Sequence, residues 1–331
     1  MDERKRKARA LGLCSGGLDS RLAARVLQAQ GIDVSLIAFE TPFFPAEKAR
    51  EAASRLSLPL TILNITDSYL RMLRNPPCGY GKNMNPCMDC HALMFRTAGG
   101  IMRDGGADFL FSGEVLGQRP MSQTRQSLRY VEKHSGYDGY ILRPLSARLL
   151  VETIPEKEGL VDRERLLDIS GRGRKRQMAL AEEIGITDYP APAGGCLLTD
   201  VGYSKRLKDL FDHQDTSTES DLHLLKYGRH FRFDSGAKIV VGRTQSDNKL
   251  LEKYRDPSRH HLLRLHERPG PIVLITAGAD KATVMLAASL CVGYSKAPQD
   301  LPVQVLVQEP GHTEQVRVLG ILPSAFKRFL L

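Results

Sequence analysis

Short apolar runs alternate with amphipathic stretches along the first half of the chain. The apolar runs, at residues 10–14, 34–39, 60–65, 108–112 and 140–142, are bounded by Gly, Pro, Asp or Ser, which is typical of buried β-strands. The segments between them, 18–30, 46–56, 68–73 and 86–102, are long enough for crossover helices. This order predicts an α/β domain with a parallel sheet, helices on both faces and a ligand site at the carboxyl ends of the strands.

The pattern changes after residue 199. Residues 203–211 have the spacing of a short helix, and the following segment DHQDTSTESD is polar and turn-rich, which is typical of a linker. Beyond it, apolar runs at 237–241, 271–275, 303–307 and 315–322 predict strands, and 280–292 has helical spacing after Asp280. We therefore predict a first domain over 1–200, a linker over 201–221 and a smaller α+β domain over 222–331.

The composition is that of an ordinary globular protein. Of the 331 residues, 42% are hydrophobic and 26% are charged, a balance that excludes a disordered or collagen-like chain. No apolar run approaches the roughly 20 residues that a membrane helix needs. The basic N-terminus is not followed by the apolar core of a signal peptide. These features predict a cytoplasmic protein.

The formal net charge of +9 weakly favours a polyanionic partner. Lys and Arg residues are dense over 226–268, where Tyr227, Phe231, Phe233 and Tyr254 are interleaved with them. Cations contact phosphates and aromatic rings stack on unpaired bases, so this pattern favours a nucleic acid. A solvated charged face over ordinary core aromatics explains the pattern equally well.

The segment CSGGLDS lies directly after the first predicted strand and opens the first predicted helix. Its two glycines allow a tight turn, and successive amides together with the helix dipole favour a bound anion. Ser15 and Ser20 could add hydroxyl donors, and Asp19 could cap the helix or hold Mg²⁺. A plain glycine turn with a capping residue is the alternative. The candidate ligand-binding residues are Ser15, Gly16, Gly17, Leu18, Asp19 and Ser20.

Six cysteines are too few for a disulfide scaffold in a chain of this length. Cys87 and Cys90 lie three residues apart at a predicted helix start, which puts both on one helix face and lowers thiol pKa values. Cys196, after two glycines, could supply a third sulfur. Three thiolates suit a [4Fe-4S] cluster with one open iron. The alternatives are zinc with three sulfurs and a water, a persulfide on Cys87 or Cys90 that Cys196 resolves, or three unrelated cysteines.

The hexapeptide SGGLDS resembles the pyrophosphate loop of the PP-loop ATPases, which have a HUP-like α/β fold. Further segments are similar, in the same order, to the tRNA 4-thiouridine synthetase family: FETPF at 39–43, CMDCHALMFRTA at 87–98, SGEVLGQ at 112–118, SQT at 122–124 and LRP at 142–144. The resemblance covers roughly residues 9 to 200. It implies cleavage of ATP between the α and β phosphates and adenylation of a carbonyl oxygen.

The resemblance therefore implies an ATP- and Mg²⁺-dependent enzyme that thiolates a uridine of tRNA with sulfide or another sulfur donor, and it leaves a homodimer open. The implied catalytic residues are Asp19, Cys87, Cys90, Cys196 and Glu114. The nucleotide would lie against residues 15–20, Phe39, Gly113 and Gln118, with Ser122 in the same cleft and Arg143 offsetting negative charge. The tRNA 2-thiouridylases, and a PP-loop ATPase that acts on a small molecule and holds structural zinc, are the alternatives.

The chain departs from that family at both ends of the resemblance. The loop begins at residue 15, where the family usually has an RNA-binding THUMP region first, and no rhodanese-like domain follows. From about residue 222 the chain resembles an NFACT-type RNA-binding domain, through KIVVGRT at 238–244 and residues 263–271. RNA binding is thus expected in the C-terminal domain, and direct use of sulfide is expected at the cysteines.

Overall fold

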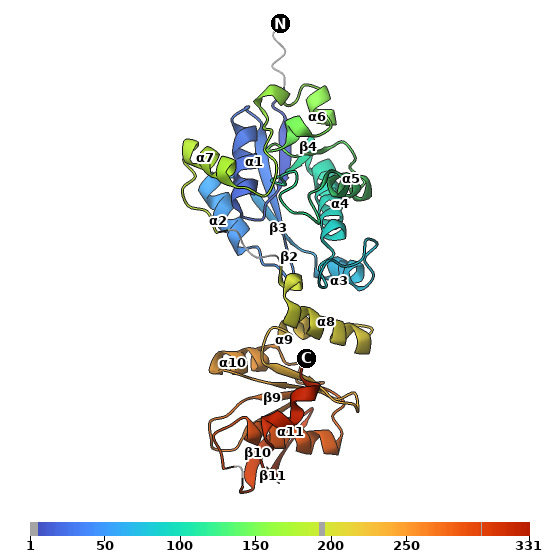
Figure 1. Ribbon diagram of the computed structural model, residues 1–331, viewed down its shortest axis with the longest axis vertical. Coiled ribbons are helices and arrows are strands. Elements are labelled where there is room, and N and C mark those ends of the chain that lie inside the picture. Colours follow the sequence, from blue (N-terminus) through green and yellow to red (C-terminus); the bar gives the residue numbers. More distant parts are fainter. Residues whose placement is uncertain (1–5, 192–195, 299) are drawn as a thin grey trace. The chain divides into compact units, whose positions relative to one another are not determined.

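The computed structural model describes residues 6–191, 196–298 and 300–331 of the chain (Figure 1). The chain divides into two compact units, Met1–Thr199 and Asp200–Leu331. No helix within the described ranges is long and apolar enough to cross a membrane.

The N-terminal unit is built on a sheet of five strands that all run parallel, in the order β3-β2-β1-β4-β5. This arrangement confirms the predicted α/β class, and the strands coincide closely with the five predicted runs. Their bounds are β1 Arg9–Leu13, β2 Asp33–Glu40, β3 Leu60–Asn64, β4 Phe109–Ser112 and β5 Ile141–Leu142.

Helices cover both faces of this sheet (Figure 1). One face carries α1 (Leu18–Gln28), α2 (Glu47–Leu56) and α7 (Lys175–Glu183), whose apolar residues join those of the strands in one core. The other face carries α3 (Thr66–Arg74), α4 (Cys87–Gly105) and α5 (Arg125–Ser135). The remaining short elements are α6 (Ile154–Lys157) and the 3₁₀ turns Ala147–Leu149, Arg163–Arg165 and Leu197–Thr199.

The order of the strands reverses between β1 and β4. The chain moves outward from β1 to β2 and β3, and then returns to place β4 on the opposite side of β1. In open parallel sheets, the loops that leave the two central strands separate at such a point and form a crevice at their carboxyl ends. The segments SGGLDS and GEVLGQ follow β1 and β4, so the topology brings these two motifs together.

The C-terminal unit is an antiparallel sheet of six strands in the order β11-β10-β8-β9-β7-β6. Helix α11 (Lys281–Gly293) packs on one face, and α9 (Glu219–Leu224) and α10 (Gln245–Tyr254) contribute to a second cluster on the other. The strand bounds are β6 Arg229–Arg232, β7 Lys238–Val241, β8 His261–Leu265, β9 Val273–Ala277, β10 Val303–Glu309 and β11 His312–Val318, and a 3₁₀ segment spans Pro323–Phe329.

Residues 201–221, expected as a linker, form helical structure of the C-terminal unit instead. Helix α8 spans Val201–His213, and the Asp200 side chain accepts a hydrogen bond from the Tyr203 amide at its start. Thr218 and Asp221 form a reciprocal capping box that starts α9. The polar residues that resemble a linker in the sequence are therefore helix caps.

Candidate functional site

The loop after β1 is held by a close backbone approach at Gly16 and by a hydrogen bond to the Gly17 carbonyl. Gly16 has φ +75°, and a Cβ atom at this position would lie 2.2 Å from the backbone oxygen of Lys48 in α2. Gly17 is the N-cap of α1, and no side chain caps this helix. Ser20 is buried and donates its hydroxyl to the Gly17 carbonyl at 2.9 Å. The first turn of α1 thus presents amide donors and the positive end of the helix dipole to a ligand.

Asp19, in the first turn of α1, is held by a residue 99 positions away. Its Oδ2 atom accepts a hydrogen bond of 3.1 Å from Gln118 Nε2, while Oδ1 is buried without a partner in the described structure. Burial raises the pKa of Asp19, and the nearby charges of Arg174 and Arg119 counter this only partly. A divalent cation would satisfy the unpartnered oxygen, because Mg²⁺ prefers carboxylate ligands and phosphate oxygens.

Gly113 and Phe39, both predicted to touch the nucleotide, have definite packing positions. A Cβ atom on Gly113 would lie 2.4 Å from the Ser20 amide nitrogen, so the segment after β4 contacts the start of α1 directly. Phe39 lies near the end of β2 and is only 7% exposed. Gly113 therefore serves first to bring two backbones together, and Phe39 lies largely within the protein.

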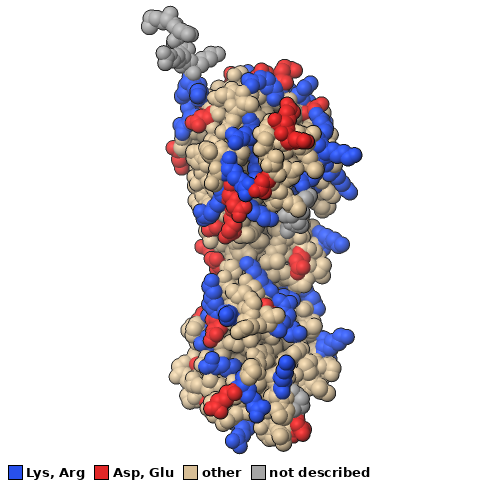
Figure 2. Space-filling view, turned by 90° about the vertical axis from the view of Figure 1, so that its left-hand side faces the viewer, with Lys and Arg blue, Asp and Glu red and all other residues tan. Residues whose placement is uncertain are grey.

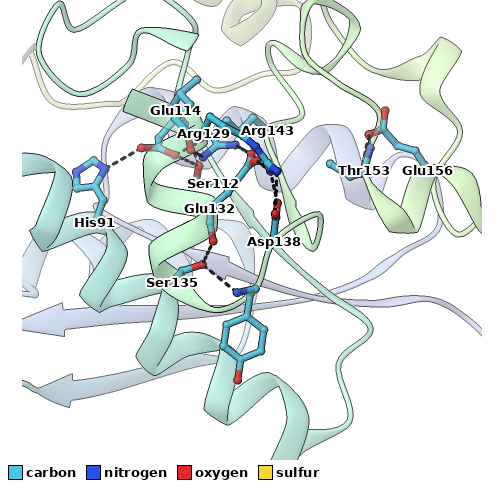
Figure 3. A network of polar contacts seen from close by, with 12 residues as sticks. His91, Ser112, Glu114, Arg129, Glu132, Ser135, Asp138, Arg143, Thr153 and Glu156 are labelled. Atoms are coloured by element: carbon cyan, nitrogen blue, oxygen red, sulfur yellow. Dashed lines mark hydrogen bonds and ion pairs between the residues drawn. The ribbon is translucent and has the colours of Figure 1, made fainter. Parts of the chain in front are cut away.

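Glu114 is the centre of a buried ionic network (Figure 3). Its Oε2 atom accepts hydrogen bonds from Arg143 Nε at 3.0 Å and from the Ser112 hydroxyl at 3.1 Å, and its Oε1 atom lies 2.7 Å from His91 Nδ1. Burial alone would raise the pKa of this carboxyl group, but Arg143 and His91 outweigh burial and lower it to about 2. Glu114 is thus an ionised acceptor that orients His91.

Arg143 is committed to this network. Besides Glu114, it pairs with Glu132 of α5 and donates to the Leu128 carbonyl, and its side chain is 1% exposed. The role expected from the resemblance, offsetting charge on the reacting groups, does not match this position. The guanidinium neutralises two carboxylates inside the unit instead.

Two of the three predicted sulfur ligands, Cys90 and Cys196, feel the charge of another of the three. Cys87 opens α4 and accepts a hydrogen bond of 3.3 Å from Asn85 Nδ2. Cys90, one turn later, is hydrogen-bonded by the Tyr69 hydroxyl, and the charges of Cys87 and Cys196 raise the pKa of its thiol further. The chain thus brings sulfurs from α4 and from a segment more than 100 residues later into one region.

The lowering of the thiol pKa that was expected at the helix start is wrong for Cys90, and the pKa of the Cys196 thiol is raised as well. Burial is the largest influence on both groups, and it raises both pKa values because a thiolate is poorly solvated there. In the sequence, Cys90 is seen only as a residue near a helix start. The packing of Tyr69 and other side chains around it is a tertiary effect.

The described residues contain no group of three or more His, Cys, Asp or Glu side chains with the arrangement of a metal site. The cysteines are free thiols. The glycine segment before Cys196, residues 192–195, lies outside the described residues. Metal or cluster binding by Cys87, Cys90 and Cys196 stays a prediction.

Two residues at this site escaped the sequence prediction. His91 directly follows the second cysteine of CxxC, and Tyr69 lies in α3 with no motif around it. Arg174 belongs to the run 172–176, for which the sequence predicts a solvated face and leaves phosphate contact as the minor alternative. Its Nε atom is buried without a partner in the described structure, so this arginine is not simply solvated.

The C-terminal unit presents a basic surface. In Figure 2, blue side chains predominate over red on the visible face of this unit. Lys253 lies 5.1 Å from the ring centroid of Tyr254, which stacks on His223 with an interplanar angle of 7°. Tyr227 and Tyr254 also pack against the core cluster of α9 and α10, so these aromatics combine a core role with a surface role.

Together these features define a class: a parallel α/β unit with a glycine loop and a helix start at its switch point, followed by a basic antiparallel unit. Comparison with known families refines this class. Residues 6–149 match the family model described as "Thiamine biosynthesis protein (ThiI)", and residues 228–328 match "NFACT protein RNA binding domain". Both resemblances inferred from the sequence are confirmed.

Two curated proteins are similar to the N-terminal part of the chain. A probable tRNA sulfurtransferase of Oceanobacillus iheyensis is 30% identical over 146 residues, which cover 41% of this chain and 34% of that protein. One of Ureaplasma urealyticum serovar 10 is 32% identical over 143 residues, which cover 41% of this chain and 36% of that protein. The similarity thus spans about a third of the length of these relatives.

Among solved structures, one titled "predicted subunit of tRNA methyltransferase", from Methanocaldococcus jannaschii, is 16% identical and covers 53% of this chain and 76% of its own. Its TM-score is 0.35, which is too low to carry an argument about function.

Proposed function

We propose that this chain is an ATP- and Mg²⁺-dependent enzyme that thiolates a uridine of tRNA. The observation that carries the proposal is Asp19. Its half-buried carboxylate lies at the start of α1, fixed on one oxygen by Gln118, while the other oxygen, Oδ1, is buried and unpartnered in the described structure. A carboxylate with a buried, unpaired oxygen beside a helix start is suited to hold a cation against a bound triphosphate.

In this proposal the loop 15–20 and the first amides of α1 bind the phosphates of ATP. Asp19 holds Mg²⁺, and the guanidinium groups of Arg174 and Arg119, whose charges act on Asp19, stabilise the charge that develops on the departing pyrophosphate. The carbonyl oxygen of the uridine attacks the α-phosphate. The adenylated oxygen is then a good leaving group.

Sulfur insertion follows without any change of oxidation state. A sulfide equivalent forms a bond to the activated carbon, the carbon–oxygen bond breaks, and AMP leaves with the former carbonyl oxygen. Glu114 and Arg143 hold His91 at the start of this region through the contacts in Figure 3. The motifs GEVLGQ and SQT favour 4-thiouridine as the product, and 2-thiouridine is the alternative.

Cys87, Cys90 and Cys196 would hold a [4Fe-4S] cluster in this proposal. The donor set fits, because the charges of Cys87 and Cys196 act on the pKa of the Cys90 thiol, and the charge of Cys87 acts on that of Cys196. When bound, the cluster supplies an open iron for sulfide. The hydroxyl of Tyr69 donates a hydrogen bond to the Cys90 sulfur.

The first experiment is nucleoside mass analysis of unmodified tRNA after anaerobic incubation with the reconstituted protein, ATP, Mg²⁺ and sulfide. A 4-thiouridine peak is expected. A 2-thiouridine peak would keep the enzyme class and overturn the choice of carbon. No thionucleoside from iron-loaded protein would overturn the tRNA substrate in favour of a small molecule.

Variants separate the two halves of the reaction. Asp19→Ala should abolish AMP release, while Cys196→Ala should abolish thiolation and iron retention and leave ATP binding intact. Cys78→Ala is the matched control, because the pKa of the Cys78 thiol responds to burial and then to Tyr130 and Asp89, and none of the other three thiols is among its influences. A fully active Cys196→Ala enzyme would contradict the cluster, and iron and acid-labile sulfide analysis would distinguish it from zinc.

A further inference from the structure

The sheet of the C-terminal unit has two faces of opposite character. On β10, alternate residues Val303, Val305 and Val307 are buried and belong to the core under α11. Leu263 of β8 and Val318 of β11 lie in the same core. Side chains alternate across a strand, so the residues between these positions lie on the other face.

Helices cover only part of that other face. Leu224 of α9 and Leu251 of α10 pack on Val240, Leu262 and Leu274, which lie on β7, β8 and β9. The rest of the face, over β10, β11 and the end of β8, belongs to neither apolar cluster. The pairing register of the strands places seven residues there, which we call the open sheet face: Arg264, Gln304, Leu306, Gln308, Thr313, Gln315 and Arg317.

Each residue of the open sheet face is exposed or half-buried. Direct cross-strand pairs link them, with Leu306 opposite both Arg264 and Gln315, and Gln304 opposite Arg317. The Gln304 amide donates a hydrogen bond of 2.8 Å to the Gln315 side-chain oxygen. The surface is therefore an ordered patch of amides between two arginines.

The acidic residues of these strands lie on the opposite face. Glu309 and Glu314 occupy the alternate positions that point to the same side of the sheet as the buried valines. Glu309 Oε1 lies 3.6 Å from His261 Nε2 on that side. The open sheet face carries two guanidinium groups, three amides and a hydroxyl, and it holds no carboxylate. Such a surface suits an anionic partner that also offers hydrogen-bond donors and acceptors in a flat array.

We infer that the open sheet face binds an unpaired segment of RNA, an inference that rests on the proposed RNA substrate. Arg264 and Arg317 contact backbone phosphates, and the amides of Gln304, Gln308 and Gln315 reach the edges of splayed bases. Unpaired bases expose those edges, whereas a duplex hides them in a deep and narrow groove. A shallow surface three strands wide fits a single strand.

The test measures RNA binding by the full chain with fluorescence anisotropy over a range of salt concentrations. The probes are unmodified tRNA, a short unstructured oligonucleotide and a duplex of equal length. Arg264→Glu/Arg317→Glu should weaken binding of the oligonucleotide and of tRNA at least about tenfold and reduce the salt slope by about 1.4, at roughly 0.7 per single-strand phosphate contact. Arg264→Gln/Arg317→Gln should give the same change in slope with a smaller loss.

The matched control is Lys281→Glu/Lys296→Glu, which makes the same change in charge at exposed positions outside the open sheet face. This control should weaken binding far less and keep the slope. Circular dichroism would confirm that all variants fold. The variant Arg264→Gln/Arg317→Gln removes the two positive charges without adding negative ones.

The outcomes separate the inference from the proposed function. If the wild-type chain binds tRNA but both arginine pairs bind as tightly as the control, the inference is overturned and the tRNA substrate survives. Tighter binding of the duplex than of the oligonucleotide would also overturn it. If an arginine pair changes the oligomeric mass without RNA, the face contacts a second copy instead. No RNA binding by the wild type would overturn the RNA substrate and the inference together.

Discussion

Glu114 and Asp19 of the N-terminal unit are both carboxylates that feel the charge of nearby arginines, yet their surroundings shift their pKa values in opposite directions. Glu114 has hydrogen-bond partners on both oxygens, and its pKa falls to about 2. Asp19 has one partner on one oxygen, and burial raises its pKa. Buried polar atoms are normally paired, so the unpaired oxygen of Asp19 is the position where we expect a ligand to supply the missing charge.

The largest expected effect is on stability, from breaking the complete network. Glu114→Ala leaves the guanidinium of Arg143 buried with one carboxylate fewer, and such a loss typically costs about 3–5 kcal/mol. Denaturant unfolding followed by circular dichroism, with the transition of the N-terminal unit fitted separately, would measure it. Glu114→Gln keeps a hydrogen-bond acceptor and should lose less. Equal stabilities of all three proteins would contradict the network.

The contributions of Glu114 and Asp19 to the free energy of unfolding are expected to depend on pH in opposite directions. The pKa of Glu114 falls from 4.5 to about 2 on folding. Its stabilisation of about 3 kcal/mol is therefore complete above pH 4.5 and lost as pH falls towards 2. The raised pKa of Asp19 acts the other way: its contribution is present below the ordinary value of 3.8 and lost as pH rises through the folded pKa.

Unfolding free energies between pH 3 and pH 7 for the wild type, Glu114→Gln and Asp19→Asn would test both signs. The Glu114 variant should lose less stability than the wild type on acidification, and the Asp19 variant should lose more. If the unfolding free energy changed with pH by the same amount in the wild type and both variants, neither carboxylate would be coupled to folding.

Asp19→Asn should slow AMP release at least about a hundredfold, which corresponds to about 2.7 kcal/mol of transition-state stabilisation. The physical reason is the loss of the negative charge that holds the cation. Stability at pH 7 should be unchanged or slightly higher, because the variant no longer buries an incompletely paired charge. A variant that releases AMP at the wild-type rate would contradict the assignment of Asp19.

The smallest effect concerns the single contact that Asp19 makes with a side chain. Gln118→Leu removes the hydrogen bond to Oδ2 and should raise the pKa of Asp19 further, moving the acidic limb of the AMP-release profile up by roughly one pH unit. Gln123→Leu is a suitable control, since Gln123 lies in the same segment and its Oε1 atom has no partner in the described structure. A profile unchanged by Gln118→Leu would show that the contact is incidental.

Much of the N-terminal unit can be predicted from the sequence. Apolar runs bounded by turn residues located all five strands, because a strand buried on both faces has a continuous apolar sequence. The position of Asp19 after the first strand was equally visible, since the glycines and the helix start are local features. The resemblance placed Gln118 and Asp19 in one cleft, but the hydrogen bond between their side chains is visible only in the structure.

The rest depends on tertiary packing that local patterns do not encode. Nothing near Glu114 in the sequence indicates that His91, Arg143 and Glu132 converge, as these residues come from three different elements. Strands β6 and β8 were missed because their charged and histidine residues interrupt the apolar pattern. The low thiol pKa expected for Cys90 failed because burial overrides the effect of the helix start.

The contact at Gly113 has a consequence for engineering. Since a side chain there would lie 2.4 Å from the Ser20 amide, the loop 15–20 and the GEVLGQ segment must keep their backbones closely packed, although Ser20 and Gly113 lie 93 positions apart in the sequence. A chimera that takes either segment alone from a relative would mismatch the two backbones. A chimera should therefore exchange both segments together if it is to take over the specificity of the relative.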